Sequence, residues 1–345
     1  MNSNPLSVNS SRLGGCTLTG ALSVTSHVSD AVSIVHGPKG CTHHNFSLLH
    51  ATWLDNGQVM APGLFSTGLR ENDIVFGGEK ALERALAKAA DRDVHAIFVL
   101  STCIVDTIGD DVDAVCAGDY GIPVIHVPTA GFLGGTFQDG LNNALIALAG
   151  TAGPCPKGRG VNIIGEMNLE YEVGANYAEV SRLLSGLGLA VNLRFVHAVT
   201  YDEFSLLGAA RLNILRNPSL VPVGEYLQKR FGTPFIASFP HGLSGTLSFI
   251  RSVADTCGID GAGAADREKA LQNEMIASFS DLMGSPVVFD TTLSGPEGSG
   301  TAQELAAALG LSPGNGCGRA LPVSPAVGTA GTRRMLHRWR RAIHA

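Results

Sequence analysis

The sequence predicts an α/β protein built on parallel sheets. Short continuous apolar runs alternate with segments of helical periodicity, which is the pattern of successive βαβ units. Hydrophobic residues make up 45% of the 345 residues and charged residues only 16%, as buried parallel strands require. Most of the 43 glycines fall at the ends of apolar runs, where a strand must enter a tight turn.

Residues 1–152 are predicted to form the first α/β section. The clearest helix spans residues 78–91, because its apolar residues recur with the helical period at Leu82, Ala85, Leu86 and Ala89. Residues 54–72 resemble a loop. The strands of this section are expected at 31–36, 95–100 and 123–127, and its other helices at 20–28, 42–53, 109–119 and 137–149.

A Pro/Gly-rich stretch at 151–160 marks the predicted domain boundary. Residues 160–258 are predicted to form a second α/β section, and residues 259–311 a helix followed by a short or incomplete third section. Further strands are expected at 161–164, 189–196, 212–215, 235–238 and 287–290, and further helices at 176–187, 201–209, 222–231, 265–283 and 302–309.

Residues 312–345 are predicted to form a basic tail rich in Gly, Pro, Ala and Arg. Glu304 is the last acidic residue, and six arginines follow it without a strand-length apolar run. We interpret this segment as disordered or loosely docked. A changed reading frame, or a short basic helix over 333–341 that meets an acidic partner, are the alternatives.

Composition excludes several classes of function. The net charge is −6 although the tail is basic, so the body is acidic and is not expected to bind nucleic acid. The first fifteen residues lack the apolar segment of a signal peptide, and no apolar run is long enough to cross a membrane. The seven cysteines, an odd number, are expected to be reduced thiols. We expect a cytoplasmic protein.

Three cysteines carry the predicted chemistry. Cys16, Cys41 and Cys103 each stand where an apolar segment meets a turn or a helix. Ligands of a parallel sheet bind at the carboxyl ends of its strands, so the three thiols are expected to meet there. Thiolates gathered in this way bind iron–sulfur clusters. The small neighbours Gly15, Gly40 and Thr102 are predicted to let backbone amides approach the cluster sulfurs.

The other cysteines and the histidines are weighed against ordinary packing. Cys116, Cys155, Cys257 and Cys317 are expected to have no ligand role. His43 and His44, just beyond Cys41, are predicted proton donors, although packing is an equal alternative. We expect His36 and His50 to be packing histidines. Five carboxylates could donate protons, but a helix-start role is expected for the last three: Glu71, Asp73, Glu79, Asp110 and Asp111.

These residues resemble the component 1 proteins of nitrogenase. The resemblance rests on Cys16-x-x-x-Gly20-Ala21 and on Val35-His36-Gly37-Pro38-x-Gly40-Cys41. Residues 66–82 and 101–111 resemble the next two blocks of the family. The layout is similar over about 14–310, and the likeness is most specific over 14–115.

The resemblance implies a nitrogenase component 1-like fold of successive doubly wound parallel-sheet domains. It implies that Cys16, Cys41 and Cys103 bind a 4Fe–4S cluster at a subunit interface. It also implies a partner, a dimeric iron protein that hydrolyses ATP and carries a second 4Fe–4S cluster. This sequence has no Gly-Lys-Ser or Gly-Lys-Thr phosphate loop, so ATP is expected on the partner.

Within the family, the short length and the variant Cys41-Thr-His43-His44 look most like the catalytic component of Ni-sirohydrochlorin a,c-diamide reductive cyclase. That resemblance implies a homodimer that reduces and cyclises a nickel tetrapyrrole in biosynthesis of the methanogen nickel coenzyme, factor 430. Six cysteines would then meet at one interface, so each subunit uses two or the cluster is larger. The alternatives are a metal-cofactor assembly scaffold and a protochlorophyllide-type reductase subunit. Nitrogenase itself is disfavoured, because we find no later Cys and His to hold its cofactor.

Overall fold

The computed structural model describes residues 14–59, 61–132, 134–170, 172–290, 295–313 and 318–345. The chain divides into two compact units, Met1–Val173 with Asn192–Phe235, and Gly174–Val191 with Ile236–Ala345. The section boundaries predicted above remain proposals. Within the described ranges, no helix has the length and apolar character needed to span a bilayer.

The first sheet confirms the predicted parallel α/β fold. Its strand order is β2-β1-β3-β4, and every neighbouring pair is parallel. The strands are β1 (Ala31–His36), β2 (Leu64–Ser66), β3 (Ala96–Ser101) and β4 (Val124–Pro128). The loop expected over 54–72 is wrong in part, because it contains β2. With three half-buried residues, β2 is too short to give a pattern.

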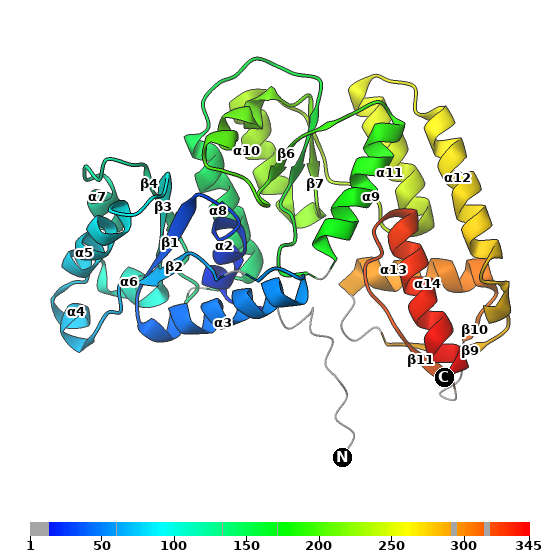
Figure 1. Ribbon diagram of the computed structural model, residues 1–345, viewed down its shortest axis with the longest axis horizontal. Helices are drawn as coiled ribbons and strands as arrows, with labels where there is room; N and C mark the ends of the chain where they lie inside the picture. Colours follow the sequence, from blue (N-terminus) through cyan, green and yellow to red (C-terminus); the bar gives the residue numbers. More distant parts are fainter. Residues whose placement is uncertain (1–13, 60, 133, 171, 291–294, 314–317) are drawn as a thin grey trace. The chain divides into compact units, whose positions relative to one another are not determined.

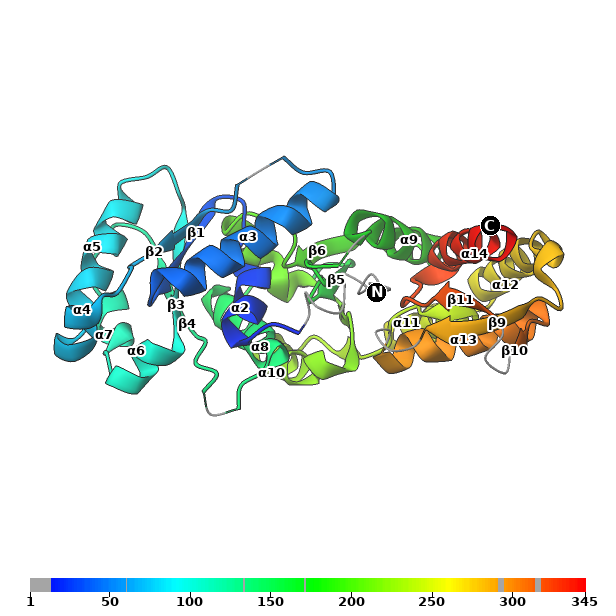
Figure 2. The ribbon, with the colours of Figure 1, turned by 90° about the horizontal axis from the view of Figure 1, so that it is seen from below.

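Helices cover both faces of this sheet. Helices α2 (Thr17–Thr25) and α8 (Phe137–Thr151) lie on one face, and α5 (Glu79–Ala90) and α7 (Val112–Cys116) on the other (Figures 1 and 2). The remaining helices of this section are α3 (Lys39–Asp55), α4 (Glu71–Phe76) and α6 (Cys103–Ile108). The single helix expected over 109–119 is wrong. Gly109, with φ +77°, ends α6 in the left-handed conformation, and α7 starts afterwards.

The second sheet has the order β6-β5-β7-β8, and β5 and β7 pair in parallel. Its strands are β5 (Val161–Ile164), β6 (Val191–Phe195), β7 (Leu212–Leu215) and β8 (Phe235–Ile236). The segments that accompany it are α9 (Val173–Gly186), the 3-10 helices η1 (Asp202–Ala209) and η2 (Pro218–Leu220), and α10 (Val221–Phe231). Strands β5 and β7 are fully buried, which explains their continuous apolar runs.

The last part of the chain forms a third sheet of parallel strands, β10-β9-β11. Helices α13 and α14 lie on its opposite faces (Figure 2). The elements are α11 (Gly242–Cys257), α12 (Ala262–Ala277), η3 (Ser280–Leu282), β9 (Pro286–Asp290), α13 (Gly295–Leu309), β10 (Ser312–Pro313), β11 (Arg319–Pro322) and α14 (Gly328–His344).

The expectation of a disordered tail is wrong for residues 318–345. Helix α14 buries Met335, Leu336 and Trp339 in a core shared with α12, α13 and β11. Trp339 Nε1 donates to the carbonyl oxygen of Pro322 at 2.8 Å, and Arg340 Nε donates to Asp281 Oδ2 at 2.9 Å. The apolar residues recur at helical spacing and never form a continuous run, so a search for strand-like runs misses them.

Candidate metal centre

The three predicted cysteines stand at the starts of three helices. Cys16 is the residue before α2, Cys41 is in the first turn of α3, and Cys103 is the first residue of α6. Strands β1 and β3 end at His36 and Ser101, so α3 and α6 begin at the carboxyl edge of the first sheet. The first turn of a helix offers unpaired N–H groups and the positive end of its dipole, which favour a thiolate.

The three thiols lie near one another. Burial raises the pKa of the Cys41 thiol, and the neighbouring Cys16 and Cys103 raise that pKa further. The backbone N–H of Gly131 donates to Cys103 Sγ at 3.2 Å. Gly131 lies in the loop after β4 and was missed in the sequence analysis, although Gly131, Gly134 and Gly135 follow a predicted strand at the same edge.

The spacing of the thiols suits a cluster and not a single ion. Among the residues that the structure describes, no three His, Cys, Asp or Glu side chains are grouped closely enough to hold one metal ion. Cysteines that bind different irons of a cluster stand farther apart than ligands of one ion. Cys16 is exposed, whereas Cys41 and Cys103 are half-buried, so the site faces solvent on one side.

Polar atoms without partners surround the thiols. Thr17 Oγ1, Thr42 Oγ1 and Asn45 Oδ1 are buried and make no hydrogen bond. Each belongs to the first two turns of α2 or α3, next to Cys16 or Cys41. A side chain added at Gly40 would meet no atom within 4 Å, so the edge has room. These residues fit an iron–sulfur cluster held by Cys16, Cys41 and Cys103; when bound, it would supply one-electron transfer.

The small neighbours of the cysteines have different surroundings. Thr102 Oγ1 donates to the carbonyl oxygen of His36 at 2.9 Å and so joins the ends of β3 and β1. A Cβ at Gly37 would come within 2.2 Å of that hydroxyl, and one at Gly15 would meet the side chain of Thr19 at 2.7 Å. Contact of Gly15, Gly40 and Thr102 with a cluster stays a prediction.

The histidines separate into two groups. His43 and His44 are exposed on α3, just after Cys41, and their role as proton donors stays a prediction. His36 is buried, with Nδ1 3.0 Å from Thr67 Oγ1 and Nε2 3.1 Å from Asp110 Oδ2. Burial lowers the pKa of His36, and the Asp110 carboxylate opposes that shift. The prediction of a packing role for His36 is confirmed. His50 stacks on Phe46, with ring centroids 6.0 Å apart.

Most of the nearby carboxylates bind backbone N–H groups. Asp111 Oδ1 accepts from Ala114 N at 3.0 Å and caps α7, as expected for a helix start. Glu79 Oε1 accepts from the N–H of Asp111 at 3.1 Å. Asp110 differs from the expectation, because it accepts from Gly78 N at 3.0 Å and contacts His36 instead of capping a helix.

The other cysteines lie apart from these three. Burial raises the pKa of the half-buried Cys116 to about 12. Cys155 is half-buried, and a Cβ at Gly208 would come within 3.2 Å of its sulfur. Cys257 is buried at the end of α11. Cys317 lies outside the described residues.

A parallel α/β fold with three thiols at one sheet edge defines a candidate metal-cluster protein. Residues 16–289 match the family described as nitrogenase component 1 type oxidoreductase. The chain belongs to this family, as the sequence motifs predicted.

Similarity to individual proteins narrows the comparison. The chain is 35% identical over 250 residues to the nitrogenase iron-molybdenum cofactor biosynthesis protein NifE of Clostridium pasteurianum, over 70% of this chain and 54% of that protein. It is 31% identical to NifE of Nostoc sp., over 76% of this chain and 55% of that protein. The nitrogenase molybdenum-iron protein alpha chain of Clostridium pasteurianum is 30% identical, over 78% of this chain and 52% of that protein.

A solved structure supports the fold. The nitrogenase Cp1 structure at pH 5 superimposes with a TM-score of 0.67 at 23% identity, covering 93% of this chain and 65% of that chain. This chain spans about half the length of the curated relatives reported above. Those relatives are cofactor-biosynthesis proteins and a nitrogenase subunit. They therefore favour the scaffold alternative over the tetrapyrrole cyclase that the sequence analysis put first.

Proposed function

We propose that this chain is a subunit of a scaffold on which an iron–sulfur-based metal cofactor is assembled and then handed to another protein. The observation that carries the proposal is the meeting of Cys16, Cys41 and Cys103 at one sheet edge, where a backbone N–H already donates to a cysteine sulfur. Similarity to NifE proteins points in the same direction.

The number of thiols makes a second subunit part of the proposal. A 4Fe–4S cluster takes four cysteine ligands, and this chain offers three at the edge. Two facing copies would supply six, so each would contribute two or would share a larger cluster. We propose a homodimer of this kind. Electrons would come from a separate ATP-hydrolysing iron protein that carries its own 4Fe–4S cluster and binds the ATP.

The proposal is tested by anaerobic purification and counting of iron and sulfide per chain. Cys16→Ala, Cys41→Ala and Cys103→Ala should each lose most of the iron and the visible absorption of the cluster. Cys116→Ala is the matched control and should keep both, because that thiol lies on α7. A colourless wild-type protein, or three variants that retain full iron, would contradict the cluster assignment.

A transfer assay separates the scaffold from the reductive cyclase. A scaffold should accept a cluster precursor and release it to an acceptor protein. A cyclase should convert Ni-sirohydrochlorin a,c-diamide when iron protein, ATP and reductant are supplied. Turnover of the tetrapyrrole without transfer would reverse our preference, and His43→Ala and His44→Ala would then test the predicted proton donors.

A further inference from the structure

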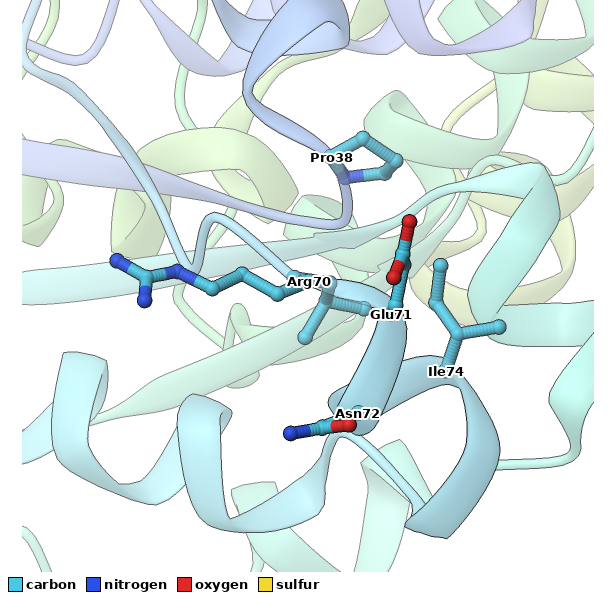
Figure 3. Close-up of a pocket in the computed structure, with 6 residues that line it drawn as sticks. Pro38, Arg70, Glu71, Asn72 and Ile74 are labelled. Carbon is cyan, nitrogen blue, oxygen red and sulfur yellow. The ribbon is translucent and has the colours of Figure 1, made fainter.

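Two adjoining pockets lie beside α4, in the unit that carries the cysteines. They share Arg70 and Asn72. The first has a volume of about 540 Å³ and is bounded by Pro38 and by Glu71 and Ile74 of α4 (Figure 3). The second, which we term the cationic pocket, has a volume of about 380 Å³. Its polar lining is Lys39, Thr67, Arg70, Asn72, Asp73 and Arg84.

Three cations from three different elements converge on the cationic pocket. Lys39 is the first residue of α3, Arg70 directly precedes α4, and Arg84 belongs to α5. Within the described part of the chain, none of the three is paired with a carboxylate. Asp73 also lines the pocket, but its Oδ2 accepts from the backbone N–H of Arg70 at 2.9 Å. The lining therefore has an excess of positive charge.

The backbone makes room for Lys39. The lysine side chain lies across Gly68, where an added Cβ would come within 3.2 Å of Lys39 Cε. Gly68 has φ +65°, which a residue with a side chain rarely adopts. Because of this glycine, the lysine side chain can lie along the pocket wall.

The wall beside Lys39 is also held in place. Thr67 Oγ1 accepts from the N–H of Gly37 at 2.9 Å and lies 3.0 Å from His36 Nδ1. Figure 3 shows Glu71 pointing toward Pro38, while the Arg70 guanidinium extends to the other side. The Glu71 carboxylate therefore lines the first pocket and leaves the cationic pocket to the three cations.

We infer that the cationic pocket binds a small polyvalent anion, either a phosphate ester or a polycarboxylate. Lys and Arg are the usual partners of such groups, because the guanidinium fork matches two oxygens and the ammonium supplies a point charge. An anion would relieve the repulsion among the three cations, and Asn72 and Thr67 add neutral polar groups. The volume suits a small metabolite. The inference is independent of the proposed scaffold function.

Calorimetric titration of the full chain, purified anaerobically, tests the site. Inorganic pyrophosphate and citrate are the probes, at constant ionic strength. Wild type should bind at least one of them, and added NaCl should weaken the binding. Lys39→Ala with Arg84→Ala should raise Kd at least tenfold. Gly68→Ala should also raise Kd without removing a charge, because it displaces Lys39.

Lys88→Ala is the matched control, since Lys88 is an exposed cation of α5 outside the pocket. Its Kd should equal that of wild type. Binding of pyrophosphate alone supports a phosphate ester, and binding of citrate alone supports a polycarboxylate. No binding to wild type, or an equal loss in Lys88→Ala, overturns the inference. Lys39→Gln with Arg84→Gln replaces the double alanine variant if that variant does not fold.

Discussion

The carboxyl edges of the first and second sheets carry opposite kinds of side chain. At the first edge, Cys16, Cys41 and Cys103 meet beside buried oxygens that have no protein partner. At the second edge, charged groups bind one another. Arg194 Nε donates to Glu166 Oε1 at 2.9 Å, and Arg216 Nη2 donates to Glu170 Oε2 at 3.0 Å.

A cluster of rings and amides completes the second edge. The rings of His27 and His197 stack with centroids 5.2 Å apart, and Trp53 Nε1 donates to His27 Nε2 at 3.3 Å. His197 Nδ1 lies 2.6 Å from Asn168 Oδ1. The amide of Asn168 donates to the carbonyl oxygens of Ser23 and Val196.

The difference shows that a parallel sheet does not by itself make a site. Both edges have the geometry at which α/β proteins bind ligands. The second edge has filled that position with its own ion pairs, and the first has left thiols and hydroxyls for a partner from outside. We therefore expect substitutions at the second edge to cost stability, and substitutions at the first edge to cost iron.

The largest effect is expected from breaking the buried ion pair of the second edge. Arg194→Met removes the cation beside Glu166, whose pKa burial already raises against the opposing effect of Arg194 and Arg216. Loss of one member of a buried pair costs about 3–5 kcal/mol. Urea unfolding should show that loss while the iron content per folded chain stays unchanged. A variant that kept its stability and lost its iron would contradict the division between the two edges.

A steric substitution should affect the first edge almost as strongly. Helices α2 and α8 meet backbone to backbone, and a Cβ at Gly140 would lie 1.8 Å from the carbonyl oxygen of Thr17. Gly140→Ala should therefore displace the start of α2, with Cys16, and lower both the iron content and the free energy of unfolding. We expect about 3 kcal/mol, the upper end for overpacking.

Gly150→Ala, in the same helix, is the control. Its Cβ would meet only Tyr226 Oη, at an ordinary 3.5 Å. Alanine is the better helix former, so this variant should be as stable as wild type or more stable by up to about 1 kcal/mol. Equal behaviour of the two variants would show that the contact between α2 and α8 does not hold Cys16 in place.

Much of the fold could be predicted from the sequence, because buried parallel strands are continuous apolar runs. The expected strand at 31–36 coincides with β1, and those at 161–164 and 212–215 coincide with β5 and β7. Elements without such a signal were missed. Strand β2 has three residues, and α14 hides its apolar residues among arginines.

The candidate site was predictable to the level of residue type. The position of Cys16, Cys41 and Cys103 before or within the first turn of a helix follows from their place after apolar runs and glycines. Their mutual approach depends on strand order, which one sequence does not determine. The N–H of Gly131 reaches Cys103 only because β4 lies beside β3, so local pattern could not reveal it.

A smaller effect, spread over pH, should come from the stacked histidines of the second edge. Burial, with His197 and Arg194, lowers the pKa of His27 to about 3, and burial with Arg194 lowers that of His197 to about 4. Both have ordinary values near 6.5 in the unfolded chain. As pH falls below 6.5, the unfolded state takes up protons that the folded state refuses, so stability falls. Each histidine should contribute about 1.4 kcal/mol per pH unit.

Unfolding measured between pH 6.5 and 5 checks this slope. His197→Gln should remove the contribution of one histidine. His43→Gln with His44→Gln, which changes two exposed rings on α3, should leave the slope as in wild type. A slope that is the same in all three proteins would show that the buried histidines do not resist protonation.

The smallest effect should distinguish a hydroxyl left for a ligand from one used by the fold, within helix α3. Thr42 Oγ1 is buried without a partner, whereas Thr52 Oγ1 donates to the carbonyl oxygen of Leu48 at 2.8 Å. In the iron-free protein, Thr42→Val should therefore be neutral or stabilising by about 1 kcal/mol, because it removes an unsatisfied polar atom. Thr52→Val should cost about 1 kcal/mol, because it removes a hydrogen bond. Thermal unfolding of both variants measures the difference, and an equal loss in the two would mean that the oxygens beside Cys41 already have partners.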